Sequence, residues 1–63
     1  MNYNAAIQEA ARLAKAKKSW VYVVLEDAFY GEYDTATEHQ LDTFHLGARP
    51  LAVANPEGFI ELC

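Results

Sequence analysis

The sequence predicts an α+β fold with the element order α-β-β-α-β-β, in which a four-stranded antiparallel sheet carries two helices on one face. Three observations support this fold class: a helical pattern of apolar residues near the start, six strand-forming residues from Trp20 to Leu25, and a turn signature before the last strand. The 63 residues are expected to form one domain, 1–63, because so short a chain has room for one core. With 52% hydrophobic and 22% charged residues, the chain is too apolar to stay disordered.

Residues 5–18 are expected to form an amphipathic helix. Its apolar residues fall within an arc of about 120° on a helical wheel, and they are Tyr3, Ala6, Ile7, Ala10, Leu13 and Ala14. The side chain of Asn2 or Asn4 can accept hydrogen bonds from the free amide groups at the helix start. Because half of these apolar positions are alanine, we expect the helix to lie close against a sheet.

The segment from Ser19 to Asp27 is expected to form the first strand. Its two faces are both apolar, with Trp20, Tyr22 and Val24 on one and Val21, Val23 and Leu25 on the other. A strand with one face in water alternates apolar and polar residues, so both faces of this strand should be covered. Helices can cover one face, and a partner molecule or a second copy of the chain can cover the other. Residues 28–31 then form a loop, with Gly31 at a positive φ, and residues 32–36 form the second strand.

The second half of the chain repeats the order helix, strand, strand. Residues 37–40 fit a capping box, as does the segment that begins two residues earlier, and a short helix is expected over 38–46. The tetrapeptide Asn55-Pro56-Glu57-Gly58 suits a type I turn between strands at 51–54 and 59–62. The chain therefore contains a faint internal repeat of element order.

The charges of the chain are separated along the sequence. Residues 1–18 hold four basic residues against Glu9, a net charge of +3, and residues 19–63 hold eight acids against Arg49, a net charge of −7. The six acids from Glu26 to Asp42 have no Lys or Arg among them, so this region should repel nucleic acid and attract a basic surface. The basic residues near the end of the first helix form either a phosphate-binding strip or, more commonly, a solvated face; they are Arg12, Lys15, Lys17 and Lys18.

The first loop is the strongest candidate for a functional site, because it places Phe29 and Tyr30 among acids. Exposed aromatic residues are typical anchors of protein interfaces. The alternative is that both rings fold back and cover the first strand. The residues expected to bind a partner are Glu26, Asp27, Phe29, Tyr30, Glu32, Asp34, Glu38 and Asp42.

No residue pattern predicts catalysis, and we expect no metal and no cofactor. His39, Asp42 and His45 spread over about 120° of a helix surface, which is too wide for three ligands of one metal ion. The chain has no glycine-rich phosphate loop and no internal Cys/His pair, so the protein is not expected to be an enzyme. The single cysteine, Cys63, suits a reducing cytoplasm. The start has no apolar signal core, and no apolar run approaches the roughly 20 residues that span a bilayer, so neither export nor a membrane location is expected.

The organisation of the chain resembles that of small phage or prophage proteins that inhibit host systems, including anti-CRISPR and anti-restriction proteins. The shared features are an N-terminal helix from Asn4 to Lys18, an aromatic-rich hairpin from Trp20 to Asp34 and an acid-only stretch from Glu26 to Asp42. The resemblance covers the whole chain in size, charge and organisation. It implies a protein that occupies a nucleic-acid-binding surface, in some cases by imitating the charge of DNA.

Two functional hypotheses of different classes follow. The first is a non-enzymatic protein-binding module that uses its acidic hairpin and second helix to occupy a basic, nucleic-acid-binding surface of a larger host protein or complex. The second is a structural or regulatory homodimer that pairs through the apolar face made by Trp20, Tyr22 and Val24. A less favoured third is a subunit that contributes strand edges to a larger complex. Direct nucleic-acid binding is not expected, because such binding depends on Lys and Arg neutralising phosphates.

Overall fold

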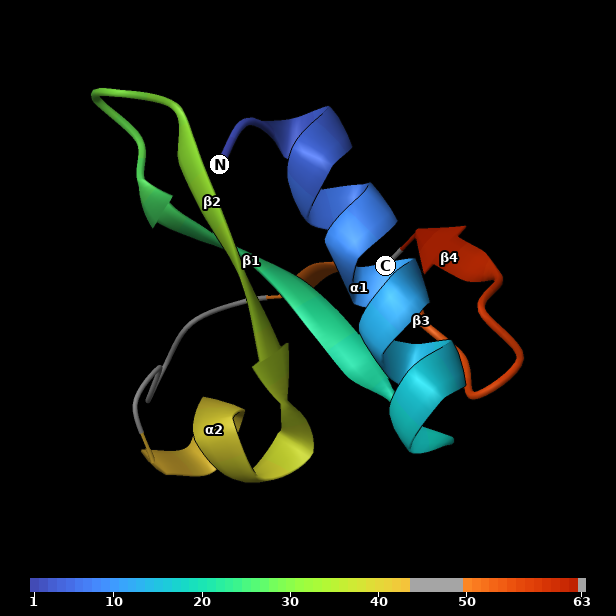
Figure 1. Cartoon of the computed structure of the whole chain (residues 1–63). Helices are drawn as coiled ribbons and strands as arrows, with labels where there is room; N and C mark the ends of the chain where they lie inside the picture. Colours follow the sequence, from blue (N-terminus) through green and yellow to red (C-terminus); the bar gives the residue numbers. More distant parts are fainter. Residues whose placement is uncertain (44–49, 63) are drawn as a thin grey trace.

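A computed structural model describes residues 1–43 and 50–62, with the side chains of residues 41–43 outside the description. The elements are α1 (Tyr3–Lys17), β1 (Val21–Asp27), β2 (Glu32–Thr37), α2 (Glu38–Thr43), β3 (Pro50–Ala54) and β4 (Ile60–Leu62). The strands form one antiparallel sheet in the order β2-β1-β3-β4, so the predicted α+β fold class is confirmed (Figure 1). β1 is therefore an inner strand that pairs with both β2 and β3.

Helix α1 crosses one face of the sheet and contacts β1, β2 and β3 (Figure 1). It begins at Tyr3 because Asn2 is the capping residue, and the Asn2 Oδ1 accepts a hydrogen bond from the Ala5 amide at 2.8 Å. Ala6, Ala10 and Ala14 are fully buried at four-residue intervals, and these short side chains bring the helix close to the sheet. At the other end, Lys18 adopts a left-handed conformation with φ 52°, which ends the helix.

The core between α1 and the sheet is built from small residues. Val21 and Val23 of β1 and Ala52 and Ala54 of β3 are buried against the alanines of α1. Val24 is also fully buried, although it lies outside this cluster. Valine is the largest fully buried side chain in the described residues, so the core is thin and depends on the close approach of helix and sheet.

The junction between β2 and α2 forms the expected capping box. The Thr37 amide donates to the Gln40 Oε1 at 2.9 Å, and the Gln40 amide donates to the Thr37 Oγ1 at 3.2 Å. These reciprocal bonds satisfy donors that a helix start leaves free, so α2 follows β2 without a break. Helix α2 contacts β2, and its predicted continuation over 44–46 lies outside the described residues.

Candidate functional site

The tip of the β1–β2 hairpin presents two aromatic rings to solvent. Phe29 is 87% exposed and Tyr30 is 74% exposed. The two rings contact each other edge to face, with centroids 4.9 Å apart. Figure 1 shows the tip extending beyond the start of α1, away from the helix-covered part of the sheet. The rings therefore do not fold back onto β1, and we call Phe29 and Tyr30 with the acids Glu26, Asp27, Glu32 and Asp34 the acidic tip.

The backbone of the turn holds the rings in this position. The Asp27 Oδ1 accepts hydrogen bonds from the amides of Phe29 at 2.9 Å and Tyr30 at 3.4 Å, which is an Asx-type turn. Gly31 then adopts φ +66°, a conformation that glycine tolerates best, and leads into β2. The pairing of β1 with β2 shifts register between Leu25 and Asp27. The Asp27 carboxylate thus stabilises the loop that displays the rings, a role that its charge alone did not predict.

The four acids of the tip differ in how free their carboxylates are. Glu26 is exposed, and Glu32 binds the N-terminal amine of Met1 through its Oε2 at 2.8 Å. Asp34 is half-buried, and its Oδ1 accepts a hydrogen bond from the Thr35 amide at 2.8 Å. Glu26 is therefore the acid of the tip best placed to meet a partner's cation.

The negative charges at the base of the hairpin affect the pKa of the Met1 amine. The hydrogen bond with Glu32 raises the pKa of this amine above its ordinary value, and desolvation opposes the shift. The charges of Glu32, Glu26 and Asp34 raise the pKa of the amine further. Acids from both strands of the hairpin therefore act together on this one cation.

The remaining predicted partner residues lie at the far end of β2. Glu38 is exposed at the start of α2, beyond the end of β2 that is remote from the tip (Figure 1). Asp42 belongs to α2, but its side chain lies outside the described residues. The structure thus groups four of the six acids along the first hairpin, with Asp34 opposite Val24 and farthest from the rings, and it places Glu38 apart from them.

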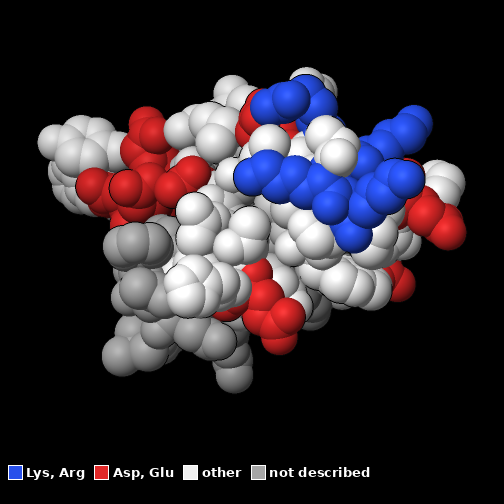
Figure 2. Space-filling model, turned by 60° about the horizontal axis from the view of Figure 1, so that its bottom comes forward, with Lys and Arg blue, Asp and Glu red and all other residues white. Residues whose placement is uncertain are grey.

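The basic residues of α1 occupy a different side of the molecule from the acidic tip. Figure 2 shows Lys and Arg gathered over α1 on one side and a group of Asp and Glu on the other. Arg12 is paired with Glu9, and this hydrogen bond lowers the pKa of the Glu9 carboxyl below its ordinary value. Lys15, Lys17 and Lys18 are exposed. The basic residues of α1 and the acids of the first hairpin are therefore also separated in space, although other acids lie beside the basic residues (Figure 2).

The predicted dimer face is only partly available. Trp20 is 45% exposed and Tyr22 is half-buried, whereas Val24 has no exposed surface. Val24 is buried within a single chain, so it has nothing left to offer a second copy. A dimer through this face would depend on Trp20 and Tyr22.

The described residues offer little for metal binding or for the enclosure of a small molecule. Among the side chains that the structure describes, those of residues 1–40 and 50–62, there is no group of three metal-ligating residues and no pocket. His45 and Cys63 lie outside the described residues. Among the helices that the structure describes, none has the length and hydropathy needed to cross a membrane.

Comparison with known proteins adds no functional information. No family model, curated protein or solved structure matches the chain.

Sequence reasoning missed two residues near these surfaces. Met1 neutralises Glu32, but the two residues are 31 positions apart and no local pattern signals such a contact. Phe59, which we expected only as part of the last strand, is 66% exposed beside the β3–β4 turn. An aromatic residue directly after a turn was the available signal.

Proposed function

We propose that this protein is a non-enzymatic binding module of the phage-inhibitor type, which uses the acidic tip to occupy a basic, nucleic-acid-binding surface of a larger host protein or complex. The observation that carries the proposal is the exposure of Phe29 and Tyr30 among acids. Because the two rings are not packed in the core, they do not stabilise the fold. We place the interaction in the cytoplasm of a bacterial host.

The two parts of the tip have different physical roles in this proposal. The acids attract a basic surface over several ångströms and raise the association rate, an effect that salt screens. The rings lose contact with water when they dock and supply short-range affinity. The already exposed rings require no rearrangement of the chain before binding. Glu38 is also exposed, but it lies at the end of β2 remote from the tip, so it can contribute only long-range attraction.

The test is a capture experiment with a matched aromatic control. The immobilised chain is exposed to a bacterial lysate at low salt, and retained proteins are identified after elution with a salt gradient. The double variant Phe29→Ser/Tyr30→Ser is compared with Phe59→Ser, which removes an exposed ring from the other hairpin. We expect the double variant to bind the retained protein at least about 30-fold more weakly, the loss expected for an interface anchor worth roughly 2 kcal/mol. The Phe59→Ser variant should bind as the wild type does.

A second measurement addresses the nature of the occupied surface. Duplex DNA added to the complex should displace the chain if both use the same basic surface of the partner. The proposal fails if DNA and the chain bind the partner together, or if affinity is equal at low and high salt. It also fails if the double variant binds normally while its thermal unfolding matches that of the wild type.

The exposure of Trp20 supports an alternative, a structural or regulatory homodimer. The ring is 45% exposed beside the half-buried Tyr22, which leaves an apolar patch at the start of β1. Sedimentation at micromolar concentration should show a dimer that Trp20→Ser dissociates and that high salt leaves intact. A monomer under these conditions contradicts the alternative without affecting the first proposal.

A further inference from the structure

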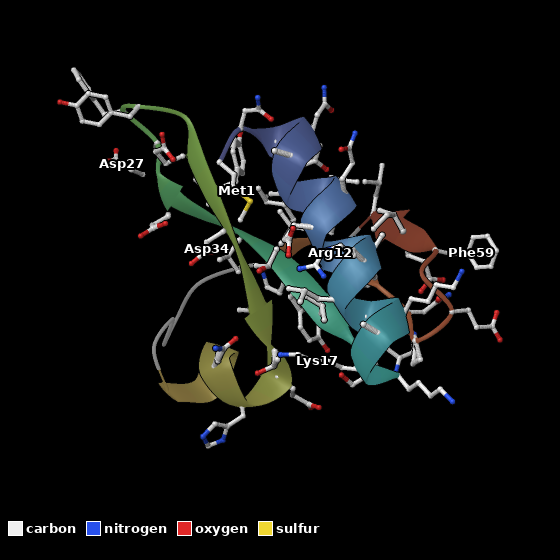
Figure 3. All side chains as sticks on the ribbon, in the orientation of Figure 1. Met1, Arg12, Lys17, Asp27, Asp34 and Phe59 are labelled. Carbon is white, nitrogen blue, oxygen red and sulfur yellow. The ribbon has the colours of Figure 1, made fainter. Side chains whose placement is uncertain are left out.

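The end of α1 carries a second exposed surface whose charge is opposite to that of the acidic tip. Lys15, Lys17 and Lys18 are exposed there, whereas Arg12 is paired with Glu9. The β3–β4 turn packs on this part of the helix: a Cβ placed on Gly58 would lie 3.5 Å from the Lys15 Cβ. Phe59 follows Gly58 and points away from the sheet (Figure 3). We call Lys15, Lys17, Lys18 and Phe59 the basic end.

The two surfaces match each other in chemistry but cannot meet within one molecule. Each has several like charges and exposed aromatic area, although the basic end also includes the exposed Glu57 of the β3–β4 turn. The two surfaces lie at opposite ends of the molecule. In Figure 3, Asp27 marks the acidic tip and Lys17 marks the end of α1. The molecule extends 31 Å along its longest axis, so contact between the surfaces requires two copies.

We propose that the basic end is a docking surface for the acidic tip of a second copy of this chain, so that copies associate head to tail. Charge complementarity selects this arrangement, because a twofold contact through either surface would bring like charges together. In each contact, lysines of one copy face Glu26 and its neighbours on the next, and Phe59 contacts the rings of the tip. A head-to-tail contact leaves one free acidic tip and one free basic end, so association can continue beyond a dimer.

A second copy fits the basic end better than nucleic acid does. The chain carries a net charge of −4, and residues 19–63 carry −7, so a polyphosphate is repelled by most of the molecule. The acidic tip of a second copy concentrates its charge at one projecting point and meets the lysines without bringing a long anion near the other acids. Such self-association goes beyond the proposed function, because it would keep the acidic tip covered until dilution or a stronger partner releases it.

The test uses two variants that each destroy one surface. The tip variant carries Glu26→Gln, Phe29→Ser and Tyr30→Ser. The basic-end variant carries Lys15→Gln, Lys17→Gln and Lys18→Asn, and asparagine is chosen at Lys18 because it tolerates the left-handed conformation found there. All six positions are exposed, so folding should be retained, and circular dichroism checks this. The single variants Phe29→Ser and Lys15→Gln provide a milder second pair.

Sedimentation velocity then measures association at low salt. Wild-type chain should form dimers and larger species whose amount rises with concentration. Association should weaken at least about tenfold between roughly 0.01 M and roughly 1 M salt, where the Debye length falls from about 30 Å to about 3 Å. Each variant alone should be a monomer. An equimolar mixture should form a dimer and nothing larger, because the mixture contains one intact acidic tip and one intact basic end per pair.

Three results would overturn this proposal. The first is a wild-type chain that stays monomeric at low salt and high concentration. The second is a mixture of the two variants that shows no dimer although both are folded. The third is an association of the wild type that persists in the basic-end variant while a single-stranded oligonucleotide binds the lysines of the wild type, which would assign the basic end to nucleic acid. None of these results depends on whether the acidic tip binds a host protein.

Discussion

The two hairpins of this protein have turns of similar construction but different surroundings. Both turns begin with a residue whose side-chain oxygen accepts backbone amides, Asp27 in the first and Asn55 in the second, and both contain a glycine at positive φ. Gly58 of the second turn lies against α1, within reach of Ala11 and Lys15. Gly31 of the first turn has only open space where a side chain would project. One turn is part of the packing of the domain, and the other displays residues beyond it.

This difference separates stability from surface function. Changes in the β3–β4 turn should alter the packing of α1 on the sheet, whereas changes at the acidic tip should alter only what the tip can contact.

Valine in place of each glycine gives the largest expected difference between the turns. Both substitutions force a β-branched residue to positive φ, at a cost of about 2 kcal/mol. At Gly58 a Cβ would already be in van der Waals contact with α1, and the two methyl groups of valine extend beyond it. Gly58→Val should therefore lower the free energy of unfolding by about 4 kcal/mol, against about 2 kcal/mol for Gly31→Val. Urea denaturation measures both. Equal losses would mean that the second turn is not packed on the helix.

Removal of the turn oxygens should give a smaller difference. The Asn55 Oδ1 accepts from the amides of Glu57 at 2.9 Å and Phe59 at 3.1 Å, so Asn55→Ala should cost about 2 kcal/mol. Asp27→Ala should cost about 1 kcal/mol, because one of its two bonds is long at 3.4 Å. Asn55→Asp and Asp27→Asn keep an acceptor and should recover most of the loss. A larger loss of unfolding free energy for Asp27→Ala than for Asn55→Ala would show that the side-chain oxygen contributes more to the first turn than to the second.

Serine in place of both rings of the tip should leave stability almost unchanged. Phe29 and Tyr30 contact each other and are otherwise exposed, so Phe29→Ser/Tyr30→Ser should change the free energy of unfolding by less than about 0.5 kcal/mol. Val23→Ala, in the buried part of β1, is the reference and should cost about 1 to 2 kcal/mol. A loss at the rings comparable with that reference would show that they stabilise the fold.

The smallest expected effect is a pH dependence confined to the first hairpin. The fold raises the pKa of the Met1 amine above its ordinary value of 8.0, chiefly through Glu32. The stabilising contribution of this pair is therefore complete below pH 8 and is lost as the pH rises through the raised pKa. The melting temperature of the wild type should thus fall more steeply above pH 8 than the melting temperature of the Glu32→Gln variant. Parallel curves for the two proteins would argue against the contact.

Local patterns were sufficient to predict the elements of the fold. Asparagine caps, the Thr37–Gln40 box and the Asn-Pro-Glu-Gly turn act over three or four residues, and each marks an element boundary close to the observed one. The order of strands in the sheet depends on contacts between distant segments, such as Tyr22 with Val53, and no local pattern encodes these. The burial of Val24 similarly depends on tertiary packing, which is why alternation alone assigned it to an open face.

The candidate site was predictable in composition but not in arrangement. The acids and rings of the tip adjoin in sequence, so a hairpin necessarily brings them together. Exposure of Phe29 and Tyr30 depends on whether the core has room for two rings. The alanines let α1 lie so close to the sheet that no such room remains between them. The distance of Glu38 from the tip was not predictable from sequence proximity, because β2 is extended and its six residues separate Glu38 from the hairpin turn.

The backbone contact of Met1 with β2 also bears on aggregation. Edge strands seed edge-to-edge aggregation when their amide and carbonyl groups remain unpaired. The outer edge of β2 is occupied at Tyr33, whose amide donates to the Met1 carbonyl at 2.8 Å. The opposite edge strand, β4, is three residues long and has Glu61 at its centre, which also discourages the addition of further strands. Both features discourage edge-to-edge growth of the sheet, at Tyr33 on one side and along β4 on the other.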